Sequence, residues 1–427
     1  MRSTCVSLGL LVSLVLTTAV RADDWPQWRG PQRDGTSKET GLLKEWPKDG
    51  PKLLWENKDV GGGYSTPAIV GDRIYMMTNT KDEESCVALD VKDGKPVWST
   101  KIGKVGKNEG PQYPGTRSTP TVDGDRIYVL GSDGDVACLE RDGGKLVWTK
   151  NIKKEFGGKP GMWAYSESVL IDGDTLICTP GGEKATLVAL KKKDGETIWK
   201  CAVPGGDEAG YASAIAVDVG GVRQYVQFLA KGLVGVEAKS GKYLWRYDKT
   251  IDPAATIPTP VFHDDCVFTS TSRNGSGLNR IKVDNGTVTS EQVYYNKTAL
   301  NSIGGTVRVG DYLYGTNAKF QGESELVCMN FKTGEVKWQH KCAGAASVCY
   351  AEGMLYVRGQ GGSGFGPEQP AFVALVEATP DGYKAKGRFE QPDHGKDKPA
   401  WPHPVVANGR LYLRDQGVLL CYDVKAK

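Results

Sequence analysis

Short apolar runs recur along the chain, and each is followed by a tight turn and a second apolar run. The stretch STPTVDGDRIYV at 118–129 closely matches STPAIVGDRIYM at 65–76. Glycine at the head of such a turn supplies the positive φ angle that a tight hairpin requires, and the flanking runs have the spacing of buried strands. Equivalent turn-and-strand segments occur eight times, at 71–75, 124–128, 173–177, 221–225, 264–268, 310–314, 352–356 and 408–412.

A second hairpin follows the first in most copies, and its last strand carries a tryptophan. VALDVKDGKPVW at 87–98 is matched by segments at 137–148, 188–199, 234–245 and 327–338. One unit therefore holds four short antiparallel strands in about 45–50 residues, which is typical of a propeller blade. The units ending near 290 and 389 lack the tryptophan.

The two ends of the propeller region hold complementary parts of one unit. Residues 51–58 have the pattern of a fourth strand, whereas 401–427 supply three strands and no fourth. The sequence thus predicts an all-β fold: an eight-bladed β-propeller of four-stranded antiparallel blades, closed by an N-terminal strand that completes the last blade. We expect six tryptophans to pack against neighbouring blades, namely Trp55, Trp98, Trp148, Trp199, Trp245 and Trp338.

The first residues have the pattern of a secretory signal peptide. Arg2 is followed by an apolar stretch from Val6 to Val20 and then by small residues before Asp23, and this stretch is short for a membrane span. We therefore expect a signal peptide at 1–22, an N-terminal arm at 23–50 and one propeller domain at 51–427. The mature chain would be a soluble monomer in the periplasm or cell envelope, with no membrane span.

Charge and composition argue against a nucleic-acid partner and against a metal centre. Removal of residues 1–22 lowers the formal net charge from +3 to +1, which gives no electrostatic reason to expect nucleic acid. The four histidines, at 263, 340, 394 and 403, lack metal-ligand spacing, so we expect no metal centre. GQGGSG at 359–364 matches the glycine pattern of a dinucleotide loop, but a strand rather than a helix follows it, and we interpret it as a loop.

The cysteines divide into two groups. Cys138, Cys328 and Cys421 occupy the position that Ala88 and Ala189 fill in other units, which indicates small packing residues. A disulfide within a second group would be compatible with export, and the sequence leaves its pairing open. That group is Cys178, Cys201, Cys266, Cys342 and Cys349.

A binding site on this fold should lie at the channel mouth, where the first strands of all blades converge. The residues just before those strands are aromatic or polar: Tyr64, Arg117, Trp163, Tyr165, Glu167, Tyr211, Asn301, Trp401 and His403. Such a set suits a peptide loop or a flat aromatic ligand. Alternatively, these side chains plug the channel and hydrogen-bond to one another.

The pattern A-x-D-x-x-x-G-x-x-x-W of the second hairpin resembles the repeat of the quinoprotein (PQQ) propeller superfamily. The resemblance extends from Trp55 to Asp423 and implies the eight-bladed fold. That superfamily includes PQQ-dependent alcohol dehydrogenases and also cofactor-free proteins such as the outer-membrane assembly factor BamB. The segment DWPQWRGPQRDG at 24–35 is similar to the start of exported propellers named only for this repeat.

The resemblance implies two different functions. The dehydrogenases carry a pair of adjacent cysteines and a Ca²⁺ ion held by carboxylate and amide oxygens; this chain has no Cys-Cys pair, and its nearest candidate ligands are Glu167 and Asn301. We therefore expect a non-enzymatic binding or scaffold platform without a cofactor, whose partner is an envelope protein or peptide. The alternatives are a PQQ- and Ca-dependent alcohol or sugar dehydrogenase and a carbohydrate or polymer binder.

Overall fold

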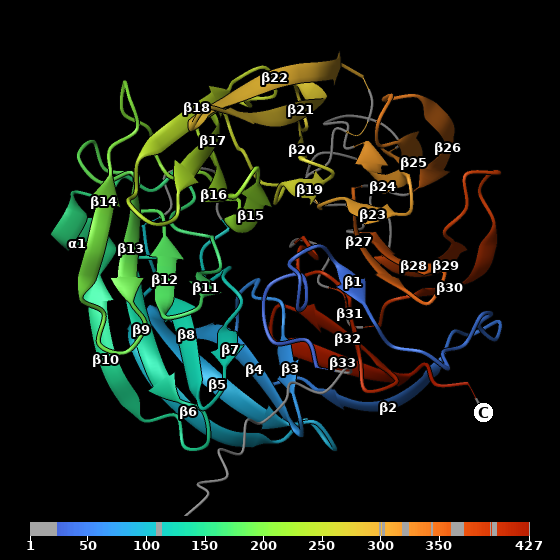
Figure 1. The fold of residues 1–427 in the computed structure, drawn as a ribbon. Helices are drawn as coiled ribbons and strands as arrows, with labels where there is room; N and C mark the ends of the chain where they lie inside the picture. Colours follow the sequence, from blue (N-terminus) through green and yellow to red (C-terminus); the bar gives the residue numbers. More distant parts are fainter. Residues whose placement is uncertain are drawn as a thin grey trace, which may run out of the picture.

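Eight β-sheets follow one another around a central axis (Figure 1). The computed structural model describes residues 24–107, 113–298, 300, 304–317, 324–342, 345–359, 371–392, 394 and 399–426. Each sheet has four antiparallel strands, and one of them gains a short fifth strand. The predicted all-β, eight-bladed propeller is confirmed, whereas the predicted signal peptide lies outside the described residues.

The blades are numbered in chain order, and the strands of each run from the inner strand to the outer strand. Blade 1 holds β3 (Ala68–Val70), β4 (Arg73–Thr80), β5 (Glu83–Asp90) and β6 (Pro96–Lys104). Blade 2 holds β7 (Thr121–Asp123), β8 (Arg126–Leu130), β9 (Asp135–Glu140) and β10 (Leu146–Asn151), followed by the short helix α1 (Ile152–Phe156). Blade 3 holds β11 (Leu170–Asp172), β12 (Thr175–Cys178), β13 (Leu187–Lys191) and β14 (Thr197–Cys201). Blade 4 holds β15 (Ile215–Val219), β16 (Val222–Leu229), β17 (Gly232–Glu237) and β18 (Tyr243–Tyr247).

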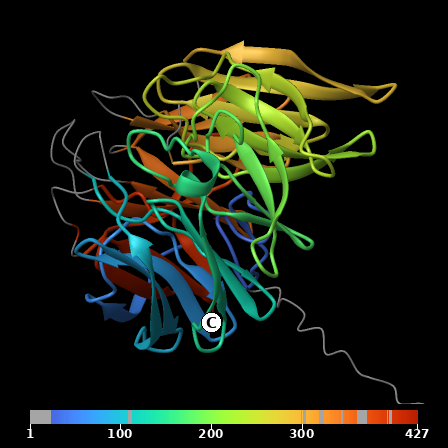
Figure 2. The same ribbon diagram turned by 90° about the vertical axis from the view of Figure 1, so that its left-hand side faces the viewer.

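The second half of the ring continues the same order. Blade 5 holds β19 (Val261–His263), β20 (Cys266–Thr271), β21 (Gly275–Asp284) and β22 (Thr287–Asn296). Blade 6 holds β23 (Val307–Val309), β24 (Tyr312–Asn317), β25 (Ser324–Asn330) and β26 (Val336–Cys342). Blade 7 holds β27 (Ala346–Ala351), β28 (Met354–Gly359), β29 (Phe372–Glu377) and β30 (Ala385–Glu390). In the side view of Figure 2, the long hairpin β21–β22, in yellow to orange, projects at the upper edge.

Blade 8 joins the two ends of the propeller. It holds β31 (Val405–Ala407), β32 (Arg410–Asp415) and β33 (Val418–Asp423), and its outer strand is β2 (Lys52–Asn57). β2 pairs with β33 in antiparallel register, with Lys52 opposite Asp423 and Asn57 opposite Leu419. The predicted closure of the ring by an N-terminal strand is therefore confirmed.

The outer-strand tryptophans connect neighbouring blades. Trp98 pairs with Ala88 across its own sheet, and its indole N–H donates to the carbonyl of Arg141 in blade 2 at 3.2 Å. A small residue stands opposite the ring because space is short: a Cβ on Gly235 would lie 2.2 Å from Trp245 Nε1. Equivalent hydrogen bonds to the next blade come from Trp55, Trp148, Trp199 and Trp338.

Three blades depart from this pattern. The indole of Trp245 packs against residues of blade 5, but its N–H donates to Gln224 in its own blade. Blade 5 uses Tyr294, whose hydroxyl donates to the carbonyl of Phe331 at 3.0 Å. In blade 7 the equivalent position is Gly387, and the side chain of Trp46 from the N-terminal arm fills the space there.

The described cysteines are buried free thiols. Cys138, Cys328 and Cys421 pair with Trp148, Trp338 and Trp55, so their predicted role as small packing residues is confirmed. The disulfide considered for the second group does not form among Cys178, Cys201, Cys266 and Cys349, because each is fixed in the interior as a separate thiol. The side chain of Cys342 lies outside the described residues.

Residues 24–50 fold back into the propeller. The arm contains β1 (Thr36–Ser37), which runs parallel to β27 on the inner side of blade 7. In Figure 1 this blue segment lies at the centre of the ring. Trp25 forms a bridge with Ile69 of blade 1, and Tyr350 N–H of blade 7 donates to Gly35. The arm is therefore part of the packed structure.

Replacement of one docking tryptophan tests how the blades are held together. Trp199 is 9% exposed and lies between blades 3 and 4, so Trp199→Ala should lower the free energy of unfolding by about 3 kcal/mol. Its neighbour Ile198 is 45% exposed, so Ile198→Ala should change it by about 0.5 kcal/mol or less. Urea unfolding monitored by fluorescence would measure both, and equal losses would contradict this role for Trp199.

Candidate functional site

The two faces of the propeller differ in the loops they carry. Because strands alternate in direction, the connections between blades and the turns between second and third strands lie on one face, here called the mouth face. The turns between first and second and between third and outer strands lie on the opposite face, here called the turn face. Candidate binding residues before the inner strands therefore gather on the mouth face.

Arg117 and three aromatic residues form the first half of the candidate site. The guanidinium carbon of Arg117 lies 5.4 Å from the ring centroid of Tyr64 and 5.9 Å from that of Trp401. The Trp401 ring lies 4.7 Å from Tyr64 and 5.1 Å from Tyr113. These residues come from blades 1, 2 and 8, so ring closure brings them together. Such distances are those of cation–π and aromatic pairs.

Trp163 and Tyr211 form the second half. Their rings lie 5.6 Å apart, and the backbone N–H of Trp163 donates to the Tyr211 hydroxyl at 3.2 Å. Arg117 links the halves, because it donates to the carbonyl of Trp163 at 3.0 Å. Burial lowers the pKa of Arg117, and the nearby Tyr64, Tyr211 and Glu84 oppose that shift. We name this set the mouth cluster: Tyr64, Tyr113, Arg117, Trp163, Tyr211 and Trp401.

Exposure within the mouth cluster is uneven. Tyr64 is buried, with 5% of its surface exposed, whereas Arg117, Trp163, Tyr211 and Trp401 are half-buried. The half-buried members can contact a ligand while their neighbours hold them in place. Tyr64 acts as the support beneath Arg117 and Trp401.

Three other expected site residues lie deeper. The Tyr165 hydroxyl donates to the carbonyl of Pro180 at 2.8 Å. Glu167 and His403 are also buried. His403 packs against Trp28 at 4.6 Å, and burial lowers its pKa well below the usual value. These side chains belong to the packed interior, so we leave them out of the candidate surface. Asn301 lies outside the described residues.

Two buried carboxyl groups brace neighbouring blades. Glu167 accepts hydrogen bonds from Thr179 of blade 3 and from Gln227 of blade 4, and Glu84 of blade 1 accepts two from Ser132 of blade 2. Burial is the main reason that the pKa of each carboxyl rises to about 7, and the hydrogen bonds oppose that rise. Their contacts indicate a structural role.

The N-terminal arm occupies the channel below the mouth. Asp24 and Glu39 bind backbone N–H groups of turns on the turn face, whereas the residues between them reach towards the mouth. Arg29 donates to the carbonyls of Asp34 and Thr306, and Arg33 donates to those of Ser168 and Val169. Both guanidinium groups are buried, and burial lowers each pKa to about 10. The arm thus forms a loop inserted from the turn face.

The described residues do not fit a Ca²⁺ site of the kind expected for a quinoprotein. Both oxygens of Glu167 are occupied by the hydrogen bonds above, and the neighbouring Arg33 would repel a cation. Among the described residues, no group of three or more histidine, cysteine or acidic side chains is placed to hold a metal. The loop GQGGSG also falls largely outside the described residues, beyond Gly359.

Sequence reasoning missed several residues that organise the mouth. Tyr113 lies four positions before Arg117 and was not singled out, because it does not stand directly before an inner strand. Arg358 and Arg414 are buried and donate to carbonyls of the next blade. The sequence does carry a signal that could have found these two arginines, since each follows the tyrosine of the repeated segment by two positions, as Gln227 does.

Within the described ranges, the structure contains no helix long and apolar enough to span a bilayer.

Comparison with known proteins gives a family and two functional classes. A family model described as outer membrane protein assembly factor BamB matches residues 36–107 and 100–340. BamB from Shewanella oneidensis is 28% identical over 258 residues, which span 57% of this chain and 60% of that protein. The match thus spans less than two thirds of this relative's own length.

Dehydrogenases are also similar to the chain. The putative dehydrogenase XoxF from Paracoccus denitrificans is 25% identical over 228 residues, which span 49% of this chain and 36% of that protein. The solved structure of quinohemoprotein alcohol dehydrogenase from Comamonas testosteroni superposes with a TM-score of 0.63 at 12% identity, over 96% of this chain and 82% of that chain. At this identity the structural likeness shows the fold alone.

The buried carboxyl groups predict how stability depends on pH. A carboxyl whose pKa rises on folding from 4.5 to about 7 binds more protons in the folded state. The free energy of unfolding should therefore fall as pH rises from about 4.5 to 7, by up to about 3 kcal/mol for each group. In Glu167→Gln, urea unfolding between pH 5 and 8 should show a shallower fall. The exposed control Glu196→Gln should keep the wild-type slope, and an unchanged slope in Glu167→Gln would contradict the assignment.

Proposed function

Because the chain belongs to the family described as outer membrane protein assembly factor BamB, we propose that it is a non-enzymatic binding platform of the cell envelope. It resembles BamB in architecture and acts as a soluble monomer after loss of residues 1–22. Its ligand is an envelope protein or peptide, held at the channel mouth. The observation that carries this proposal is the half-buried aromatic and arginine surface of the mouth cluster.

The chemistry of the mouth cluster suits recognition. Aromatic rings and arginine are the side chains that most often dominate protein interfaces, because they bury a large area in few rotamers. Trp163, Tyr211 and Trp401 are held by neighbouring rings and backbone groups, so little side-chain entropy is lost on binding. Loops on a rigid frame commonly carry such sites.

The filled channel favours binding at the surface over chemistry within the propeller. Arg29 and Arg33 take up channel space and are hydrogen-bonded to residues just before the inner strands of blades 6 and 3. A flat cofactor in the channel would have to displace this loop. A PQQ-dependent dehydrogenase remains the alternative to a binding platform, and the experiment below distinguishes the two.

Substitutions in the mouth cluster test the proposal directly. Trp163→Ala, Tyr211→Ala and Trp401→Ala should each reduce recovery of the bound envelope partner at least about tenfold, since central aromatic residues carry most of an interface's binding energy. The matched control is Tyr295→Ala, on the outer strand of blade 5 and 37% exposed. A photo-crosslinker at position 211 should capture the partner, and one at Lys145 on the turn face should not.

Two results would contradict the proposal. One is an identical set of captured proteins for wild type and all three mouth variants, or, on the side of the ligand, a polysaccharide captured in place of any protein. The other is enzyme activity: a quinone absorbance that survives desalting after incubation with PQQ and Ca²⁺, together with dye-linked alcohol oxidation.

A further inference from the structure

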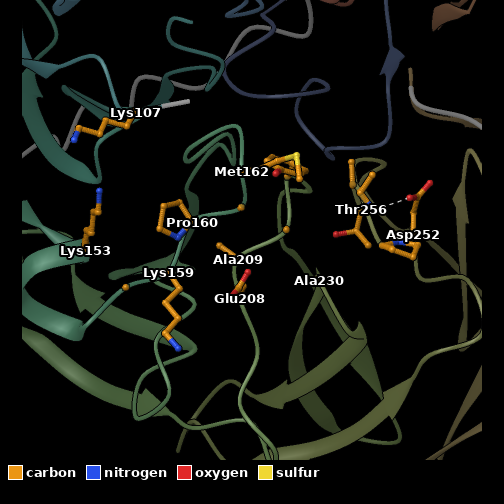
Figure 3. Close-up of a pocket in the computed structure, with 17 residues that line it drawn as sticks. Lys107, Lys153, Lys159, Pro160, Met162, Glu208, Ala209, Ala230, Asp252 and Thr256 are labelled. Carbon is orange, nitrogen blue, oxygen red and sulfur yellow. Dashed lines mark hydrogen bonds between the residues drawn. The ribbon is translucent and has the colours of Figure 1, made fainter. Parts of the chain in front are cut away.

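A groove of about 450 Å³ opens on the mouth face beside Tyr211. Its walls come from the connections that link blades 1 to 5 and from a turn of blade 4 at Ala230, and Figure 3 shows the residues that line it. Tyr211 belongs both to the groove and to the mouth cluster, so the two surfaces are continuous. Most of the uncharged residues that line the groove are glycine, alanine or proline, among them Gly161, Gly210 and Ala230.

The floor of the groove is formed largely by backbone. A Cβ on Gly161 would lie 2.2 Å from the Tyr211 hydroxyl, and one on Gly210 would lie 2.4 Å from the carbonyl of Phe228. Larger residues are excluded at these two positions because the structure beneath them is closely packed. The surface left above them admits the backbone of an extended chain, whose side chains alternate between the two walls.

One wall carries three lysines. Lys107, Lys153 and Lys159 line the groove from the side of blades 1 to 3, and all three lie on the same side of the close-up in Figure 3. Lys153 pairs with Asp133 at 3.2 Å. Among the interactions of the described residues, Lys107 has no carboxylate partner, and the ammonium group of Lys159 has none either. This wall therefore presents uncompensated positive charge.

The opposite wall contains an acidic residue, Asp252, but exposes little of its negative charge. Asp252 is 3% exposed, and its carboxylate accepts hydrogen bonds from Ala254 N–H and the Ser272 hydroxyl, each at 2.9 Å. Its charge is directed into its own loop and toward the turn after β20, where Arg273 lies 3.8 Å away. Glu208 is exposed and also lines the groove. It lies beside Lys159, because the N–H of the adjacent Ala209 donates to the carbonyl of Lys159 at 3.0 Å. The lysine side therefore carries three positive groups and one acidic group.

We propose that this groove binds an extended acidic segment of a partner protein, with alternate carboxylates facing Lys107, Lys153 and Lys159. The inference rests on the proposed function and deepens it, because it names the chemistry of the segment that lies next to the mouth cluster. A free inorganic anion fits less well, since the lysines line a groove open to solvent and do not enclose a pocket. The residues facing Glu208 should be neutral or basic.

Synthetic peptides test the charge preference. Mature protein should bind a fluorescein-labelled peptide of alternating glutamate and serine at least about tenfold more tightly than the matched glutamine–serine peptide, and should not bind the lysine–serine peptide. Binding should weaken as salt rises from 0.02 to about 0.15 M, because solvent-exposed charges are screened. Fluorescence anisotropy measures each affinity.

Charge reversal at the lysine wall locates the site. Lys107→Glu combined with Lys159→Glu should weaken binding of the acidic peptide at least about tenfold, whereas Glu208→Gln should strengthen it about twofold. Lys145→Glu, a reversal of equal size in a turn on the turn face, is the matched control and should leave affinity unchanged. Equal binding of the glutamate and glutamine peptides, no effect of the double reversal, or displacement by millimolar phosphate would each overturn the inference.

The two proposals fail in different ways. If the lysine double variant still captures the envelope partner while the mouth variants lose it, the acidic-segment inference is wrong and the binding platform stands. If the acidic peptide binds as expected but the mouth variants capture the partner normally, the groove is a binding site and the role proposed for the mouth cluster is wrong.

Discussion

Closure of the ring is the constraint on which the rest of the structure depends. The backbone pairing of β2 with β33 removes the open sheet edge that three strands of blade 8 would leave. Arg414 strengthens the junction from the mouth side, where its buried guanidinium donates to carbonyls of Ser65, Met77 and Gly62 in or before blade 1. Only a closed ring brings Tyr64 and Trp401, near opposite ends of the chain, into ring contact.

A closed ring of eight blades leaves an axial channel, and the N-terminal arm fills it. The arm contacts inner strands or adjoining residues of several blades through Trp25, Trp28, Arg29 and Arg33. Buried guanidinium groups are tolerated there because backbone carbonyls accept hydrogen bonds from them. Trp46 extends the same segment outwards and packs where Gly387 leaves space in blade 7. One segment thus fills the channel and also packs into blade 7.

Ionisable groups that suggest chemistry in the sequence serve mainly as braces between blades. Glu84 joins blades 1 and 2, Glu167 joins blades 3 and 4, and Arg358 joins blades 7 and 8. Each places a polar group at a junction where neighbouring sheets diverge and backbone groups need partners. The resulting frame holds the aromatic and charged groups of the mouth face, which come from the loops before the inner strands of blades 1 to 5 and 8.

The sequence by itself determined the repeat, the number of blades, the closing strand and the tryptophan positions, because these depend on local hydrophobic alternation and on turns that glycine favours. It also placed Arg117, Trp163, Tyr211 and Trp401 on one face, since the loops before inner strands must converge. Only the tertiary structure decided which of the eight described site residues are exposed. Tyr165, Glu167 and His403 share the loop positions of the others, yet they point into the interior. The structure also decided that the arm fills the channel and that distant lysines share one groove. Such contacts join residues far apart in the chain, and their formation depends on how whole blades pack, which no local pattern encodes.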